Sequence, residues 1–298
     1  MMGVNELTGK GFAITASIGE DLEIHLNTGK SKEMTKNNSV DAPPIPSATI
    51  LMLRDRNEAM EVFMVVRHHQ IDFASGALVF PGGKADPNDF DPALRQHIDG
   101  ADPNENRCAI QVAAIREAFE ECGILLARDE SGSELITKER LQQLDHYRTR
   151  LHGGELSVLD FLREENLRLA ADRLVHFAHW ITPENLPKRF DTHFFLAKAP
   201  EDHLATHDGY ESVDSVWIQP SEAFEDAEAG RRSIIFPTLR NVAKLAQSKT
   251  TEEAIKRAGN DKIITVLPKM ETRPDGVYLS IPPEAGYDIS EELLPPEK

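Results

Sequence analysis

Residues 116–124 have the sequence REAFEECGI, and this stretch decides the fold expected of the chain. With Glu117 placed at 0° and about 100° of turn per residue, the apolar residues around it fall between about 140° and 220° on a helix. These apolar residues are Cys108, Val112, Ile115, Phe119 and Cys122. Gly123 stands where a C-terminal cap belongs, so the sequence predicts a helix from about Asn106 to Cys122.

Three glutamates lie on the opposite side of this helix. Glu120 falls at about 300° and Glu121 at about 40°, so both share a sector of roughly 100° with Glu117. A solvated helix face is one interpretation. It has an electrostatic cost, because Glu117 and Glu121 are like charges one turn apart and acidic groups near a helix C-terminus oppose the macrodipole. A divalent cation would remove both penalties, and a set of oxygen ligands selects Mg²⁺, Mn²⁺ or Ca²⁺.

A pair of glycines follows a β-favouring run upstream of the helix. The segment 80–84, FPGGK, comes directly after the strand expected over 77–80. Gly82 and Gly83 would let main-chain N–H groups approach an anion, and Lys84 adds a positive charge. Taken alone, a glycine pair after a strand is equally typical of an ordinary turn.

Together, the helix and the glycine pair resemble the signature of the Nudix hydrolases. The second half of that signature, Arg-Glu-apolar-x-Glu-Glu-x-Gly-apolar, matches residues 116–124 in full. The first half departs twice: Asp89 stands six residues after Gly83 where the family has Glu, and the loop before Arg116 is about 19 residues longer, which costs little in free energy. The insertion leaves Asp89 without an assigned role.

The resemblance implies an α+β fold, a Nudix-type α/β/α sandwich with a mixed central sheet and, in this chain, a helical insertion. The hydrolase domain is expected over residues 45–248, with insertions at 89–106 and about 131–172. Residues 1–44 form an N-terminal extension, a hairpin and linker in this prediction, and residues 249–298 form a C-terminal extension.

Local patterns predict the individual elements. Strands are expected over 49–53, 62–66, 77–80, 174–180, 190–197 and 213–218. Further helices are expected over 137–151, 157–171, 221–229 and 237–247, and a possible strand pair over 263–267 and 277–281. This mixture of strands and helices lacks strict alternation, which favours a mixed sheet over a doubly wound parallel one.

The resemblance also implies a reaction. Nudix enzymes cleave a nucleoside diphosphate linked to another moiety, by attack of water on a phosphorus of the pyrophosphate. Carried onto this chain, Glu117, Glu120 and Glu121 would hold Mg²⁺ or Mn²⁺, which neutralises the diphosphate and lowers the pKa of a bound water. Arg116 would hold a carboxylate in place.

Other residues complete the implied site. Gly82, Gly83 and Lys84 would face the metal or the phosphates, and Arg67 would contact the substrate. The family has no single fixed general base, so a carboxylate of the helix and Glu211, from a later loop, both remain candidates.

Two segments favour one class of substrate. Residues 80–89, FPGGKADPND, resemble an element of the coenzyme A diphosphatases, and the inserted box with residues 180–192 resembles a eukaryotic branch that cleaves acyl-CoA. CoA or acyl-CoA would yield 3′,5′-ADP and phosphopantetheine or its acyl form. The alternatives are NADH, ADP-ribose or a nucleotide sugar as substrate, or a non-catalytic Nudix-like nucleotide sensor. Lys188 and Arg189 would grip a 3′-phosphate or form a surface ion pair with Asp191.

Composition limits the class of partner. Lys and Arg number 33 against 50 Asp and Glu, a formal net charge of −17. Such a surface repels nucleic-acid polymers and anionic membranes, so a small-molecule partner is expected, and a homodimer is left open. The chain has 2 cysteines, no basic leader and no apolar run beyond about six residues, which favours a cytoplasmic protein.

Overall fold

The computed structural model describes residues 43–67, 76–184, 186, 188–200 and 212–294. Its strands are β1 (Ile45–Arg56), β2 (Ala59–Arg67), β3 (Leu78–Val79), β4 (Gly82–Lys84), β5 (Ile98–Asp99), β6 (Ala127–Asp129), β7 (Leu167–Ala170), β8 (Val175–Ile181), β9 (Phe190–Lys198), β10 (Ser212–Ile218), β11 (Thr265–Val266), β12 (Lys269–Arg273), β13 (Gly276–Ser280) and β14 (Glu291–Leu293). Its α-helices are α1 (Glu105–Cys122), α2 (Lys138–Leu144), α3 (Tyr147–His152), α4 (Val158–Glu165), α5 (Pro220–Glu228), α6 (Phe236–Leu245) and α7 (Thr251–Asn260). Short 3₁₀ helices cover Pro87–Phe90, Pro92–His97, Ala171–Arg173 and Pro283–Ala285.

A mixed sheet runs through the centre of the molecule. Its strand order is β10-β2-β1-β9-β8-β11, with β3 paired to β2 and β4 paired to β1. The pairs β1–β9 and β8–β11 are parallel, whereas the other pairs are antiparallel. The predicted mixed sheet is therefore confirmed.

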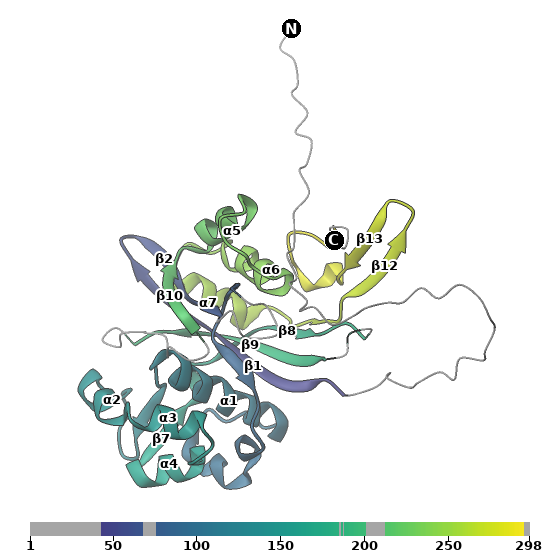
Figure 1. Cartoon of the computed structure of the whole chain (residues 1–298). Coiled ribbons are helices and arrows are strands. Elements are labelled where there is room, and N and C mark those ends of the chain that lie inside the picture. Colours follow the sequence, from purple (N-terminus) through teal and green to yellow (C-terminus); the bar gives the residue numbers. More distant parts are fainter. Residues whose placement is uncertain (1–42, 68–75, 185, 187, 201–211, 295–298) are drawn as a thin grey trace, which may run out of the picture.

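Helices cover both faces of this sheet (Figure 1). Along β1, alternate side chains point to opposite faces: Ala48, Ile50 and Met52 pack in the core beneath α1, and Leu51 and Leu53 pack in the core that includes α6 and α7. Helices α2 to α4 lie on the same side as α1, and α5 to α7 lie on the opposite side. The predicted α/β/α sandwich with a helical insertion is confirmed.

The insertion differs in detail from the prediction. The helix expected over 137–151 is broken into α2 and α3 around Asp145, whose N–H closes the end of α2 on the carbonyl of Gln142. The helix expected over 157–171 ends at Glu165, because Asn166 adopts a left-handed conformation with φ 53°. The residues after it form β7, which pairs with both β5 and β6 in a three-stranded sheet. The two predicted insertions are thus joined to each other.

The C-terminal region also corrects an expectation. The segments 263–267 and 277–281 do not pair with each other: β11 extends the central sheet beside β8, and β13 pairs with β12 and β14. Helix α7, which the sequence analysis did not predict, begins at the N-cap Thr250 and buries Ala254 and Ala258 in the core. Residues after 248 therefore share the core of the sheet, and the domain limits remain a prediction. The hairpin expected within residues 1–44 lies outside the described residues.

Helices in the described part of the chain are all too short or too polar to traverse a lipid bilayer.

The insertion is attached to α1 through aromatic packing, which can be tested. Phe161 of α4 stacks on Phe119 of α1 with ring centroids 5.7 Å apart, and both side chains are about 1% exposed. We expect Phe161→Ala to lower the free energy of unfolding by about 3–5 kcal/mol, since it removes a buried ring and leaves a cavity. Phe90→Ala is the matched control, because Phe90 is 40% exposed. Urea denaturation measures both variants, and equal losses would contradict the assigned packing.

Candidate functional site

The last two turns of α1 carry the candidate site. The helix begins at Asn104, whose side chain accepts a hydrogen bond from the Arg107 N–H at 3.0 Å. It ends at Gly123, which adopts φ 65° and donates its N–H to the Phe119 carbonyl at 3.0 Å. A left-handed C-cap is strained for residues other than glycine, so this position sets where the helix stops. Glu117, Glu120 and Glu121 consequently lie within about two turns of a fixed helix end.

The glutamates of α1 are not a solvated face. Glu120 and Glu121 are each only 5% exposed, and the side chain of Glu117 is 12% exposed. The apolar stripe predicted on the opposite side is buried as expected. Because both sides of the helix are covered, the hypothesis of a solvated glutamate face is wrong, and the carboxylates need specific partners.

Arg116 is the main partner of these acids. Its guanidinium donates hydrogen bonds to Glu117 Oε1 at 2.8 Å, to Glu120 at 3.3 Å, to Asp89 at 3.0–3.3 Å and to the Lys84 carbonyl at 2.9 Å. Burial acts to lower the pKa of Arg116, but the charges of Glu117, Asp89 and Glu120 outweigh it and raise the pKa. The side chain stays charged and holds three carboxylates together.

Asp89 is the site residue that the sequence analysis did not assign. It is 2% exposed, and besides Arg116 it accepts the N–H of Asp86 at 2.8 Å. Asp86 in turn caps the 3₁₀ helix Pro87–Phe90 by accepting the Asn88 N–H. Burial is the largest influence on Asp89 and raises its pKa, against the lowering effect of Arg116. Its spacing of six residues from Gly83, where the Nudix signature has Glu, was the signal that could have found it.

Close backbone approach explains the glycine pair. The N–H of Gly82 donates to Glu121 Oε2 at 2.9 Å. A Cβ on Gly83 would lie 2.5 Å from Glu117 Oε1, and a Cβ on Gly82, which has φ 153°, would lie 2.3 Å from the Ala48 carbonyl. Strand β4 pairs with β1 at Ala48 and Gly83, and this register places both glycines next to α1.

A divalent cation fits this arrangement. The donors are carboxylate oxygens, which Mg²⁺ and Mn²⁺ prefer. Burial is the largest influence on Glu120 and raises its pKa, although Arg116 and His152 act to lower it. A cation would offset this cost of burying several negative charges in one place. Because Gly83 has no Cβ, the Glu117 carboxylate can lie beside its backbone.

The helical insertion reaches the same site. Arg148 of α3 donates to the main-chain carbonyl of Glu120 at 3.0 and 3.2 Å, and so satisfies an open carbonyl near the end of α1. His152 places Nδ1 3.6 Å from Glu120 Oε2. Neither contact was predicted, because the pairing of segments far apart in sequence leaves no local pattern.

The remaining predicted site residues are less closely joined. Lys84 is exposed and meets the site through its carbonyl. Arg67 ends β2, where its backbone bonds to Gly76 and Ala77, and among the described contacts its side chain makes none with the glutamates. Glu211 lies outside the described residues.

Further residues of the segment 180–192 can be placed. Trp180 is 4% exposed and donates to the Tyr287 hydroxyl at 2.7 Å, so it packs in the core. Asp191 contacts His179, whereas Arg189 donates to the Thr182 carbonyl at 3.1 Å, so the described contacts do not include the suggested ion pair with Asp191.

Comparison with known proteins gives a consistent family. Residues 95–245, about half of the chain, match the NUDT19 Nudix domain. A Caenorhabditis elegans protein named as a nudix hydrolase is 26% identical over 188 residues, covering 63% of this chain and 56% of that protein. The acyl-coenzyme A diphosphatase NUDT19 of Xenopus laevis is 23% identical over 276 residues, covering 78% of this chain and 73% of that protein.

A solved structure agrees in fold. The crystal structure of a NUDIX hydrolase from Alicyclobacillus acidocaldarius superposes with a TM-score of 0.59 at 25% identity. The alignment covers 72% of this chain and 96% of that protein. The chain thus spans 96% of the length of this bacterial enzyme, but 56% and 73% of the length of the two curated relatives.

The close approach of Gly83 to Glu117 generates a prediction. Gly83→Ala would drive the Glu117 carboxylate from its position, since Cβ atoms do not approach oxygen at 2.5 Å. We expect at least a tenfold loss of Mn²⁺ affinity, measured by isothermal titration calorimetry. Gly259→Ala is the matched control, because its Cβ meets nothing within 4 Å and it should bind Mn²⁺ as the wild type does. Unchanged affinity in Gly83→Ala would exclude Glu117 as a ligand.

Proposed function

The chain belongs to the Nudix family, and on this premise we propose that it is a metal-dependent hydrolase that cleaves the pyrophosphate bond of a nucleoside diphosphate linked to another moiety. One observation carries the proposal: Glu117, Glu120 and Glu121 of α1 lie against the glycine pair of β4 with little exposure, and Arg116 bonds to Glu117, Glu120 and Asp89 while the Gly82 N–H bonds to Glu121. Burying several carboxylates in one place costs free energy. Clusters of this kind are therefore found preferentially at functional sites.

Each residue of the cluster has a proposed role. Glu117, Glu120 and Glu121 are the ligands for Mg²⁺ or Mn²⁺, which, when bound, neutralises the diphosphate and lowers the pKa of a coordinated water. Arg116 fixes Glu117 and Glu120 relative to each other through its hydrogen bonds. The N–H of Gly82 orients Glu121.

The residues on the loop side face the substrate in this proposal. Gly83 keeps the space beside Glu117 open, and the exposed Lys84 supplies a positive charge for the phosphates. Arg67 is the proposed additional substrate contact at the end of β2.

The reaction needs a proton acceptor. The oxygen of water forms a new bond to phosphorus, the bridging P–O bond breaks, and the proton of the water passes to a base. A carboxylate of α1 is one candidate for this base. Glu211 is the second candidate.

CoA or acyl-CoA is the proposed substrate, with 3′,5′-ADP and phosphopantetheine or its acyl form as products. Residues 80–89 resemble the element of CoA diphosphatases, the domain match is to NUDT19, and the Xenopus laevis relative is named an acyl-CoA diphosphatase. NADH, ADP-ribose or a nucleotide sugar remain the alternative substrates within the same reaction class.

A non-catalytic nucleotide sensor is the alternative from another class. Retention of Glu117, Glu120 and Glu121, together with their low exposure, favours the enzyme. The proposed partner is a small anion, because a protein of net charge −17 repels polyanions yet binds a diphosphate where a cation reverses the local field. Cys108 and Cys122 are buried and not joined in a disulfide, which supports the proposed cytoplasmic location.

Substrate class is tested with a panel. We expect the full chain with Mg²⁺ or Mn²⁺ to release 3′,5′-ADP from CoA or acyl-CoA faster than it cleaves NADH, ADP-ribose or a nucleotide sugar, as followed by mass spectrometry. A chelator in place of the metal should abolish product. Faster cleavage of another compound would reassign the substrate, and cleavage of none, combined with thermal stabilisation by a nucleotide, would support the sensor.

The ligand role of Glu121 gives a second prediction. Glu121→Gln keeps an oxygen that can accept the Gly82 N–H but loses the charge, so the fold should survive and turnover should fall about hundredfold or more. Glu130→Gln is the control, since Glu130 is exposed and away from the site. Steady-state rates and circular dichroism measure both. Wild-type turnover in Glu121→Gln would refute the metal assignment.

A further inference from the structure

A second group of polar side chains lies on the face of the central sheet that α1 covers. The pairing of strands sets one row across the sheet: Gly83, Ala48, His193, His179 and Thr265, on β4, β1, β9, β8 and β11. Neighbouring strands lie about 4.8 Å apart, so the backbone of His193 is about 10 Å from that of Gly83. The row therefore leads from the glycine pair to two adjacent histidines and Thr265.

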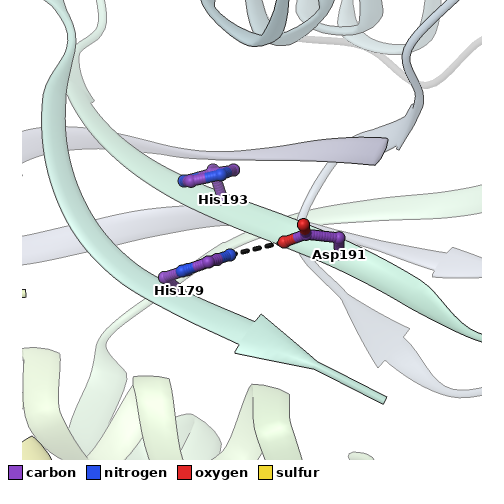
Figure 2. A group of neighbouring side chains, drawn as sticks. All are labelled: His179, Asp191 and His193. Carbon is purple, nitrogen blue, oxygen red and sulfur yellow. Dashed lines mark hydrogen bonds and ion pairs between the residues drawn. The ribbon is translucent and has the colours of Figure 1, made fainter. Parts of the chain in front are cut away.

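Asp191 joins these histidines from β9. Residues two apart on a strand share a face, so Asp191 and His193 point to the same side, and His179 faces them from β8 (Figure 2). His179 Nε2 contacts Asp191 Oδ1, and the rings of His179 and His193 stack with centroids 4.0 Å apart. One ligand atom from each of the three residues lies within 4.8 Å of the others, a spacing that no other such group in the described part of the chain reaches.

The second nitrogen of each ring is held by another side chain. His179 Nδ1 lies 2.8 Å from Thr265 Oγ1, and His193 Nδ1 lies 3.0 Å from His176 Nε2. Histidines that bind metals have this arrangement, in which one nitrogen is oriented by a partner and the other faces the ion.

One of the three residues, His193, borders a cavity. This cavity of about 160 Å³ is also lined by His176 and Phe195 from the sheet and by Arg107 and Gln111 from α1. Space of this size holds several water molecules. The side chain of Asp191 is 37% exposed, so the site has an entry path.

We propose that His179, Asp191 and His193 form a second metal site, distinct from the α1 glutamates, that takes Zn²⁺ or a similar transition-metal ion. Two imidazoles and one carboxylate suit such ions, whereas Mg²⁺ prefers oxygen ligands alone. A tetrahedral Zn²⁺ with bonds of about 2.0–2.1 Å holds its ligand atoms about 3.4 Å apart, so side-chain adjustments of about 1 Å close the site. Water would supply the fourth ligand. The inference does not rest on the proposed function, because it concerns binding alone.

The test measures Zn²⁺ binding to the metal-free full chain with millimolar Mg²⁺ present, which occupies the carboxylate site. We expect one equivalent of Zn²⁺ to bind in calorimetry, with at least a tenfold loss of affinity in Asp191→Asn and in His193→Gln. Asp191→Asn matters most, because it is isosteric, partly exposed and still able to accept a hydrogen bond from His179. Glu121→Gln is the matched control and should bind Zn²⁺ as the wild type does.

A spectroscopic readout identifies the ligands. Co²⁺ in place of Zn²⁺ should give the visible absorption of a four-coordinate ion, lost in Asp191→Asn and kept in Glu121→Gln, with thermal melting to show that each variant is folded. Zn²⁺ binding that disappears in Glu121→Gln but survives in Asp191→Asn would overturn the proposal. So would a wild-type chain that binds no Zn²⁺ at micromolar concentration, which would leave His179 and Asp191 as a hydrogen-bonded pair.

Discussion

The guanidinium of Arg116 is the interaction on which the site depends. It bonds to Asp89 after the glycine pair, to the carbonyl of Lys84 on β4, and to Glu117 and Glu120 on its own helix. One side chain therefore fixes the helix relative to the loop. A lysine could not replace it, because the fork of five N–H donors is what reaches partners on three sides. The glycine pair lets the backbone of β4 approach α1, and the capped 3₁₀ helix Pro87–Phe90 positions the Asp89 carboxylate. Both features bring partners to the Arg116 guanidinium.

The acidity of the site and that of the whole chain have different consequences. A net charge of −17 acts at long range and is screened over about 10 Å by salt, so it selects against polyanions. Glu120, Glu121 and Asp89 are nearly inaccessible to solvent and are screened much less. Their burial raises the pKa of Glu120 and Asp89, because it disfavours the charged carboxylates. The positive charge of Arg116 offsets this effect in part. A divalent cation near these groups acts where the field is strongest.

The sequence predicts those parts of the fold that depend on local periodicity. The apolar stripe of α1, its glycine cap and the strands expected over 49–53 and 62–66 each occupy a few turns or residues, and each appears in the structure. Arg148 and His152 could not be placed, because they reach Glu120 from the helical insertion, whereas the spacing of Asp89 from Gly83 did carry a signal. The pattern of the β7 segment predicts helix, but its strand state comes from pairing with β5 and β6.

The register of the sheet links what sequence separates most widely. Gly83 and His193 are distant along the chain, yet Ala48 pairs with both and brings them into one row on the face that α1 covers. The size of the side chains in that row differs: Ala48 is small and fully buried, so α1 lies close to the sheet there, whereas the larger His193 borders the cavity at the N-terminal half of the helix. One helix on one sheet therefore offers hard oxygen donors at its C-terminal end and faces imidazole nitrogens near its other end. The oxygen donors favour Mg²⁺ or Mn²⁺ and the imidazoles favour Zn²⁺, so the two sites select different cations although they are close together.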